Sequence, residues 1–188
     1  TCFGTRWLHA CIWHQVSRSI SPLAPGRSVD GGNLTIDELM GVKAVDSIDL
    51  SGRRLGMMSA IIIGACAAGN RHLRELNLSR TKLGKEGAKA LASAIRDSTS
   101  VTCLDVRNNS ISGDGASQLS AAVLGNPKME NFNEIPIKEM RTNSFTKLDL
   151  SGKNVGVAGG MVVAGLLPVM ASVTSIDVGY NKIGQAAS

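Results

Sequence analysis

One apolar spacing occurs five times along the chain, and this repetition constrains the fold more than any other feature. In the stretch LRELNLSRTKL, the first, fourth, sixth and eleventh residues are Leu73, Leu76, Leu78 and Leu83. The same frame starts again at residues 45, 101, 145 and 173, so that 45, 73 and 101 are 28 residues apart, as are 145 and 173. A period between about 20 and 50 residues is typical of a solenoid, in which each unit packs on its neighbours.

Each unit is predicted to contain a strand, a turn and a helix. The fourth and sixth positions are two residues apart and point to one face of a strand, whereas the polar fifth position points to the other. Farther along the second unit, Ala88, Leu91, Ala92 and Ile95 form one apolar stripe at helical spacing. A single unit cannot bury both surfaces, so neighbouring units must stack, with parallel strands in one layer and helices in the other.

Three segments resemble the leucine-rich repeat of the ribonuclease-inhibitor type: LRELNLSRTKLGKEGAKALASAI, VTCLDVRNNSISGDGASQLSAAV and FTKLDLSGKNVGVAGGMVVAGLL. The resemblance covers residues 45–188 and implies an α/β solenoid shaped like a horseshoe, with parallel strands on the concave face and helices on the convex face. This family often has an asparagine at the ninth position, where its side chain satisfies buried loop amides. Asn109 and Asn181 match that pattern and Thr81 can substitute, whereas Arg53 and Lys153 depart from it.

We expect one repeat domain over residues 33–188, after a poorly ordered leader and linker over residues 1–32. The domain would begin with a cap at residues 33–44, because the first repeat of a solenoid has no neighbour on one side. Repeats would then start at residues 45, 73, 101, 129, 145 and 173, the last one truncated. The repeat from 129 is short, and Pro136 predicts that it keeps its strand but loses its helix, while the strand layer continues.

The leader has the composition of a transit peptide, with several serines and with Arg6, Arg18 and Arg27 preceding the first acidic residue, Asp30. An unstructured leader is the simpler interpretation. It also contains Cys2, His9, Cys11 and His14, but this spacing matches no common zinc module, so we predict no metal site.

Cys66 and Cys103 are not placed at a disulfide spacing, which favours reduced thiols. We therefore expect a cytoplasmic protein, with import into an organelle as the alternative if the leader is a transit peptide.

Charge and hydropathy exclude two classes of partner. The net charge is +5, but the three leader arginines account for 3 of these charges, which leaves +2 and nearly balanced repeats. Binding to a phosphate backbone relies on a concentrated basic surface, so we predict no nucleic-acid partner. The uncharged segment GMMSAIIIGACAAG, residues 56–69, is shorter than the roughly 20 residues that a membrane-spanning helix needs.

A row of acids and amides occupies the fifth strand position and would run along the concave face: Asp49, Asn77, Asp105, Asn133, Asp149 and Asp177. Such a row could hold a basic peptide or a cation, although an exposed strand face needs polar residues in any case. Basic residues at the tenth position, such as Arg54, Lys82 and Lys182, could neutralise it. We predict a protein-binding face with these candidate contact residues: Asp49, Glu75, Asn77, Asp105, Arg107, Lys147, Asp149, Asp177 and Tyr180.

We predict no catalytic residues and no cofactor. No nucleophile, base and orienting group converge in the pattern, and no phosphate-binding loop follows any predicted strand. The expected function is a non-enzymatic scaffold for a partner protein. The alternative is a GTPase-activating protein resembling Ran GTPase-activating protein, whose functional residues we cannot match in this sequence.

The outside of the first repeat is predicted to be apolar. The helix positions that carry Lys85, Glu86 and Lys89 in the second repeat carry Met57, Met58 and Ile61 in the first. In the fifth repeat, Val157, Ala158, Met161 and Gly165 are predicted to face outward in the same way. A contiguous apolar patch usually has a cover or a partner. We expect residues Trp7 to Ile20 to pack on Met57, Met58 and Ile61, or the chain to self-associate there.

Overall fold

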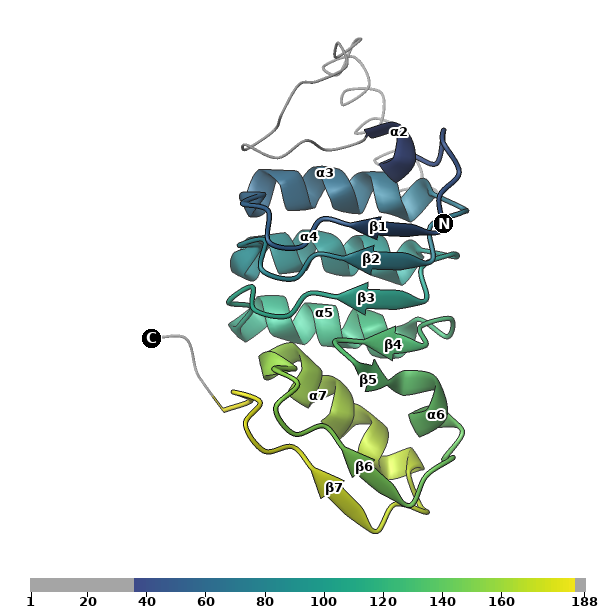
Figure 1. Cartoon of the computed structure of the whole chain (residues 1–188), viewed down its shortest axis with the longest axis vertical. Helices are drawn as coiled ribbons and strands as arrows, with labels where there is room; N and C mark the ends of the chain where they lie inside the picture. The colour runs from purple at the N-terminus through teal and green to yellow at the C-terminus, as the bar shows by residue number, and fades with distance from the viewer. Residues whose placement is uncertain (1–35, 185–188) are drawn as a thin grey trace, which may run out of the picture.

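The computed structural model describes residues 36–184, which form a layer of short strands and a layer of helices (Figure 1). Strands and helices alternate because each repeat switches from an apolar period of two residues to one of three to four. After helix α2 (Ile36–Leu39), the elements are β1 (Ser47–Asp49), α3 (Gly56–Gly69), β2 (Glu75–Asn77), α4 (Gly84–Asp97), β3 (Cys103–Asp105), α5 (Gly113–Gly125), β4 (Asn131–Phe132), β5 (Ile135–Pro136), α6 (Ile137–Arg141), β6 (Lys147–Asp149), α7 (Gly156–Leu166), a 3-10 turn (Leu167–Val169) and β7 (Ser175–Asp177).

The strands form two sheets rather than one. The first has the order β1-β2-β3-β4-β5, and the second contains β6 and β7. In the first sheet Ile48 pairs with Leu76, and Leu76 pairs with Leu104, so the parallel register reproduces the 28-residue repeat. In the second sheet Leu148 pairs with Ile176 in the same way. The predicted α/β solenoid with parallel strands is therefore confirmed.

The short repeat from residue 129 differs from its prediction in two respects. Its strand β4 turns back into β5, which pairs with it antiparallel, so β5 ends the first sheet and the strand layer does not continue into β6. A helix is also present, because α6 starts directly after Pro136. Proline at the edge of a sheet or before the first turn of a helix loses no hydrogen bond, so Pro136 is compatible with both β5 and α6.

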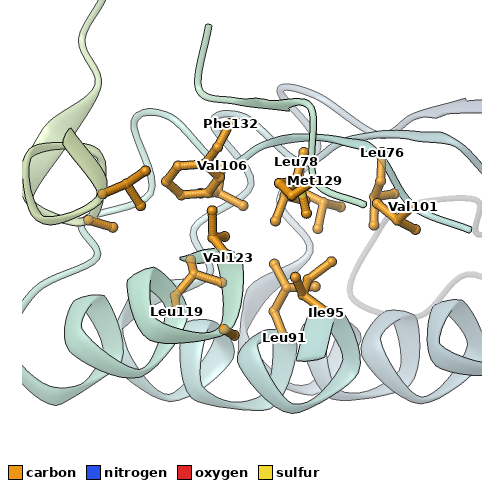
Figure 2. Close-up of a cluster of buried hydrophobic side chains, with 14 of the residues drawn as sticks. Leu76, Leu78, Leu91, Ile95, Val101, Val106, Leu119, Val123, Met129 and Phe132 are labelled. Atoms are coloured by element: carbon orange, nitrogen blue, oxygen red, sulfur yellow. The ribbon is translucent and has the colours of Figure 1, made fainter. Parts of the chain in front are cut away.

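The core lies between the two layers. Leu76 and Leu78 from the second strand segment face Leu91 and Ile95 of α4, and Phe132 of β4 extends the same cluster towards α5 (Figure 2). All five of these side chains are 0–1% exposed. In the repeats from residues 45, 73, 101 and 145 the fourth and sixth positions enter this core, so the fifth position points to the opposite face of the sheet.

The helix layer depends on close approach between neighbouring helices. A Cβ atom on Gly115 of α5 would lie 2.5 Å from the carbonyl oxygen of Lys85 in α4. A Cβ atom on Gly64 of α3 would lie 3.3 Å from the carbonyl oxygen of Ala90. Small residues at these positions allow neighbouring repeats to stack at the spacing that the strands impose.

Helix α2 packs against the first repeat. Its residue Leu39 is fully buried, and the side-chain amide of Asn70 donates to the carbonyl oxygens of Glu38 and Leu39 at 2.9 and 3.0 Å. These bonds satisfy carbonyls that the end of a helix leaves unpaired. The predicted leader, the cysteine and histidine residues within it, and the covering segment Trp7 to Ile20 all lie outside the described residues.

Candidate functional site

Helices cover one face of the strand layer, and the other face of β1–β3 and β6–β7 is open (Figure 1). We call this open surface the strand face. Six of the nine candidate contact residues are exposed on it or at its edge: Asp49, Glu75, Lys147, Asp149, Asp177 and Tyr180, the last of which is 93% exposed. Asn77, Asp105 and Arg107 are half-buried. The candidates are thus divided between two sheets, and the strand register places Asp49 beside Asn77 and Asp149 beside Asp177.

The fifth-position row has a structural role that the sequence reasoning did not identify. In each full repeat the side-chain Oδ1 atom accepts a hydrogen bond from the backbone amide two residues on, at 2.8 to 3.0 Å. Asp and Asn are favoured at turns because their side chains can make this local bond. Hydrogen bonds from Ser51 hold the pKa of Asp49 below its usual value, and hydrogen bonds from Ser151 do the same for Asp149. The row therefore ends β1, β2, β3, β6 and β7 in the same way.

Asp105 and Arg107 bind each other. Arg107 Nη2 lies 2.7 Å from Asp105 Oδ2, and Nε donates to both carboxylate oxygens at 3.0 Å. Arg107 also pairs with Glu134 and donates to the carbonyl oxygen of Lys153 at 3.2 Å. The hydrogen bonds that Arg107 donates to Asp105 raise the pKa of Arg107. The geometry gives this pair a structural task, which is to hold the third repeat against the turn of the fifth.

Asn133 is not part of the exposed row, and the prediction was wrong for this residue. It is 2% exposed, with Oδ1 accepting from the amide of Val106 at 2.8 Å and Nδ2 donating to the carbonyl of Val155 at 3.1 Å. The backbone of Asn133 is left-handed, with φ of 52°, because the chain reverses here from β4 to β5. The reversal turns the side chain inward.

Two ladders of buried polar side chains fix the turns at the two ends of the strands. Asn109 Oδ1 accepts from the amides of Thr81 and Leu83 at 2.8 and 3.2 Å, and Asn181 Oδ1 accepts from Val155 at 3.3 Å. The family resemblance predicted this first ladder, from the asparagine that the family often has at the ninth position. A second ladder of Asn70, Ser98 and Asn126 was missed, although these residues are also 28 apart. Their side-chain oxygens accept hydrogen bonds from backbone amides of the segments that precede the next strands.

The two described cysteines are poor nucleophiles. Burial raises the pKa of Cys66 to about 11, and burial is also the main cause that raises the pKa of Cys103. A thiol reacts as its thiolate, which is scarce when the pKa is raised. Within residues 36–184, no group of three His, Cys, Asp or Glu side chains is placed to hold a metal ion. Over the same range, no helix combines the length and the apolar character needed to cross a bilayer.

Comparison with known proteins agrees with this geometry. A family model described as "Leucine Rich repeat" matches residues 69–92 and 97–120, which contain β2 with the start of α4 and β3 with the start of α5. The chain is a leucine-rich repeat protein. Leucine-rich repeat proteins are typically non-enzymatic scaffolds with a general role in protein interaction. Assignment to the ribonuclease-inhibitor type stays a prediction.

One curated relative of this leucine-rich repeat protein is the leucine-rich repeat-containing protein 45 of Gallus gallus. It is 32% identical over 100 residues, which cover 52% of this chain and 15% of the relative. The chain thus matches only a small part of that protein. Among solved structures, Leiomodin-1 Actin-Binding Site 2 (ABS2) aligns with a TM-score of 0.52 and 13% identity, covering 76% of both chains. At this identity the likeness concerns the fold alone.

The outer face of α3 is apolar and exposed, with Met57, Met58 and Ile61 at 44, 55 and 43% exposure. Self-association through these residues stays a prediction. In the fifth repeat Met161 is 39% exposed, but Ala158 is 2% exposed. The prediction was wrong for Ala158, which lies on the core side of α7.

Proposed function

We propose that this leucine-rich repeat protein binds another protein through its strand face. The observation that carries the proposal is that the parallel sheets are covered by helices on one side only (Figure 1). Parallel sheets are normally buried on both faces. An open face lined with polar side chains, on a rigid stack of repeats, is suited to receive the surface of a second protein.

Three strand-face residues are the strongest candidates for direct contact. Glu75 and Lys147 are exposed, and neither side chain forms a hydrogen bond or ion pair with other described residues. Tyr180 is 93% exposed on the turn after β7. Tyrosine is enriched at energetically dominant contacts because its ring buries a large apolar area while its hydroxyl stays available for a hydrogen bond. Asp105 and Arg107, by contrast, already form an ion pair with each other.

Affinity capture with quantitative mass spectrometry tests the proposal. The test variant combines Glu75→Lys, Lys147→Glu and Tyr180→Ala, and so leaves the net charge unchanged. The control variant, Glu86→Lys with Arg96→Glu, also conserves charge and changes exposed residues of α4 in the helix layer. We expect a partner recovered by the wild type and the control to fall at least tenfold with the test variant, since loss of one hot-spot residue costs about 2 kcal/mol or more. Equal recovery by all three proteins would contradict the proposal.

The GTPase-activating alternative gains no support from the described residues. The arginine on the strand face, Arg107, is held by Asp105, Glu134 and the carbonyl of Lys153. An arginine that completes the site of a partner enzyme must be free to reach it. The alternative therefore rests on the family resemblance alone.

A further inference from the structure

The turns that follow β1, β2, β3, β6 and β7 carry basic residues and no acidic ones, whereas the turn after β4 carries Glu134, which pairs with Arg107. These turns are residues 51–55, 79–83, 107–111, 151–155 and 179–183, and we call them together the basic edge. Their basic residues are Arg53, Arg54, Arg80, Lys82, Arg107, Lys153 and Lys182. The opposite edge, where helices lead into strands, carries both signs, as in the ion pair between Glu130 and Lys138. A chain with nearly balanced charge thus gathers one sign along one edge.

Only part of this positive charge is offset within the protein. Arg107 is paired with Asp105 and Glu134, and Arg53 and Lys153 act on the nearby carboxylates of Asp49 and Asp149. The remaining side chains are exposed and form no ion pair within residues 36–184; they are Arg54, Arg80, Lys82 and Lys182. Exposed charges with no internal partner are free to meet a ligand of opposite sign.

The helices reinforce the potential at this edge. α3, α4 and α7 start directly after one of these turns and α5 starts after Ser112, and none of their N-termini is capped by a side-chain hydrogen bond. The N-terminus of a helix carries a partial positive charge of about half an elementary charge. The first turns of α3 and α7 contain no acidic residue that would offset it.

A shallow pocket of about 250 Å³ lies along the basic edge. It is lined by Ser51, Gly52, Ser79, Arg80, Arg107, Asn108 and Asn154, and so extends across turns from several repeats. The hydroxyl, guanidinium and amide groups in this lining are hydrogen-bond donors. A carboxylate accepts such bonds, and those from an arginine are among the strongest in proteins.

Three of the basic residues lie at backbone positions that favour glycine or asparagine. Arg80, Lys82 and Lys182 are left-handed, with φ of 57, 61 and 52°. At the equivalent positions other repeats have residues that tolerate this conformation well, such as Gly152 and Asn154. Arginine and lysine are less favourable than glycine or asparagine at such positions.

We propose that the basic edge binds an acidic segment of another polypeptide, whose carboxylates contact Arg80 and Lys82 and enter the adjoining pocket. A single-stranded nucleic acid fits less well, because its bases need aromatic side chains on which to stack. Tyr180 is the single aromatic residue in the five turns, so the edge offers little surface for base stacking. The basic edge adjoins the strand face and shares Arg107 and Tyr180 with it, but this inference does not depend on the function proposed for that face.

Fluorescence anisotropy with the full chain tests this inference. The probe is a fluorescein-labelled peptide of ten glutamates, and a peptide of ten lysines is its control. In the edge variant, Arg80→Gly with Lys82→Asn, the charges are removed but both residues suit a left-handed backbone. In the control variant, Arg71→Asn with Arg74→Asn, two exposed cations are removed from the opposite edge.

We expect the edge variant to bind the glutamate peptide at least tenfold more weakly than the wild type, and the control variant to bind within twofold of it. The edge variant should melt at the same temperature as the wild type or higher, which excludes unfolding as the cause. Binding should weaken as salt is raised, because the charges are exposed.

Several results would overturn the inference. One is failure of the wild type to bind the glutamate peptide at low salt, and another is an equal loss in the edge and control variants. A ten-nucleotide single-stranded RNA that competes as well as the peptide would show a general polyanion site instead. If Glu75→Lys with Lys147→Glu abolishes peptide binding while the edge variant does not, the strand face binds the peptide and the basic edge does not.

Discussion

The first three full repeats and the last two are built from the same unit but are held together differently. In the first sheet, β1, β2 and β3 pair in continuous register and α3, α4 and α5 pack side by side (Figure 1). The second sheet, β6 and β7, shares no strand pairing with the first. Across the junction, side chains replace the backbone ladder, as when Arg107 donates to the carbonyl of Lys153 and Asn133 donates to that of Val155.

Arg141 is the clearest example of this replacement. From α6 its guanidinium donates to five carbonyl oxygens at 2.9 to 3.3 Å, three of them at the end of α5: those of Val123, Leu124 and Asn126. A basic side chain at the C-terminus of a helix satisfies unpaired carbonyls and complements the helix dipole. Regular repeats are joined by backbone bonds and by ladders of polar side chains, whereas the shortened repeat uses a charged side chain to terminate the helix before it.

The largest effect is expected from Asn109→Ala in the first region. Asn109 is 3% exposed, donates to the carbonyls of Leu78 and Val106, and accepts from Thr81 and Leu83. Its removal leaves several buried backbone groups without partners, and each costs about 1–3 kcal/mol. We expect a loss of about 3–4 kcal/mol in the free energy of unfolding, measured by urea denaturation.

Asn181→Ala in the second region is the matched comparison. Asn181 donates to the carbonyls of Leu150 and Val178 and accepts from one amide, that of Val155. With fewer buried partners to lose, it should cost about 1–2 kcal/mol. Equal losses of unfolding free energy for the two variants would contradict this expectation, because they would mean that Asn109 and Asn181 stabilise the two regions equally.

The regular part of the fold follows from the sequence, because every local preference in it agrees with the repeat. Leu76 at the fourth position and Ala88 on the helix stripe are both fully buried, as their spacing requires. The junction could not be derived in the same way. The chain reversal at Asn133 and the reach of Arg141 to α5 depend on contacts between residues 15 or more apart that have no counterpart in other repeats.

The sequence predicted which residues lie on the strand face, but not which of them have no bonding partner within the protein. Strand periodicity places Asp105 and Arg107 together, and it carries no information about whether two opposite charges bind each other or a partner. The second amide ladder, by contrast, was available in the spacing of Asn70, Ser98 and Asn126.

The variant Arg141→Met should weaken the junction between the two regions. It keeps much of the side-chain volume and removes the hydrogen bonds to all five carbonyl oxygens. Because Arg141 is half-buried, water can reach some of the released carbonyls, and we expect a loss of about 2 kcal/mol in unfolding free energy. Hydrogen exchange should quicken over α6, β6 and α7 before it quickens over α4. Arg141→Lys is the control, since it keeps the charge and should lose less. A uniform increase in exchange over all helices would contradict a weakened junction.

The smallest effect tests what the two regions share. Asp49 in the first region and Asp149 in the second close their turns alike, and both have a pKa lowered from 3.8 by hydrogen bonds from the serine two residues on. A lowered pKa means that the folded state favours the carboxylate. The stabilisation is therefore present above pH 3.8 and is lost as the pH falls through the lowered values.

Asn77 shows how this bond can be kept without an ionisable group, because its Oδ1 accepts a hydrogen bond from the amide of Ser79 at 3.0 Å. Asp49→Asn with Asp149→Asn should then leave stability at pH 7 nearly unchanged and reduce its decline between about pH 5 and pH 2. Thermal unfolding across that range measures the change, and each single variant should supply a similar share. A decline as steep as that of the wild type would show that other carboxylates govern acid unfolding, and a loss at pH 7 would show that the turn needs the charge as well as the acceptor.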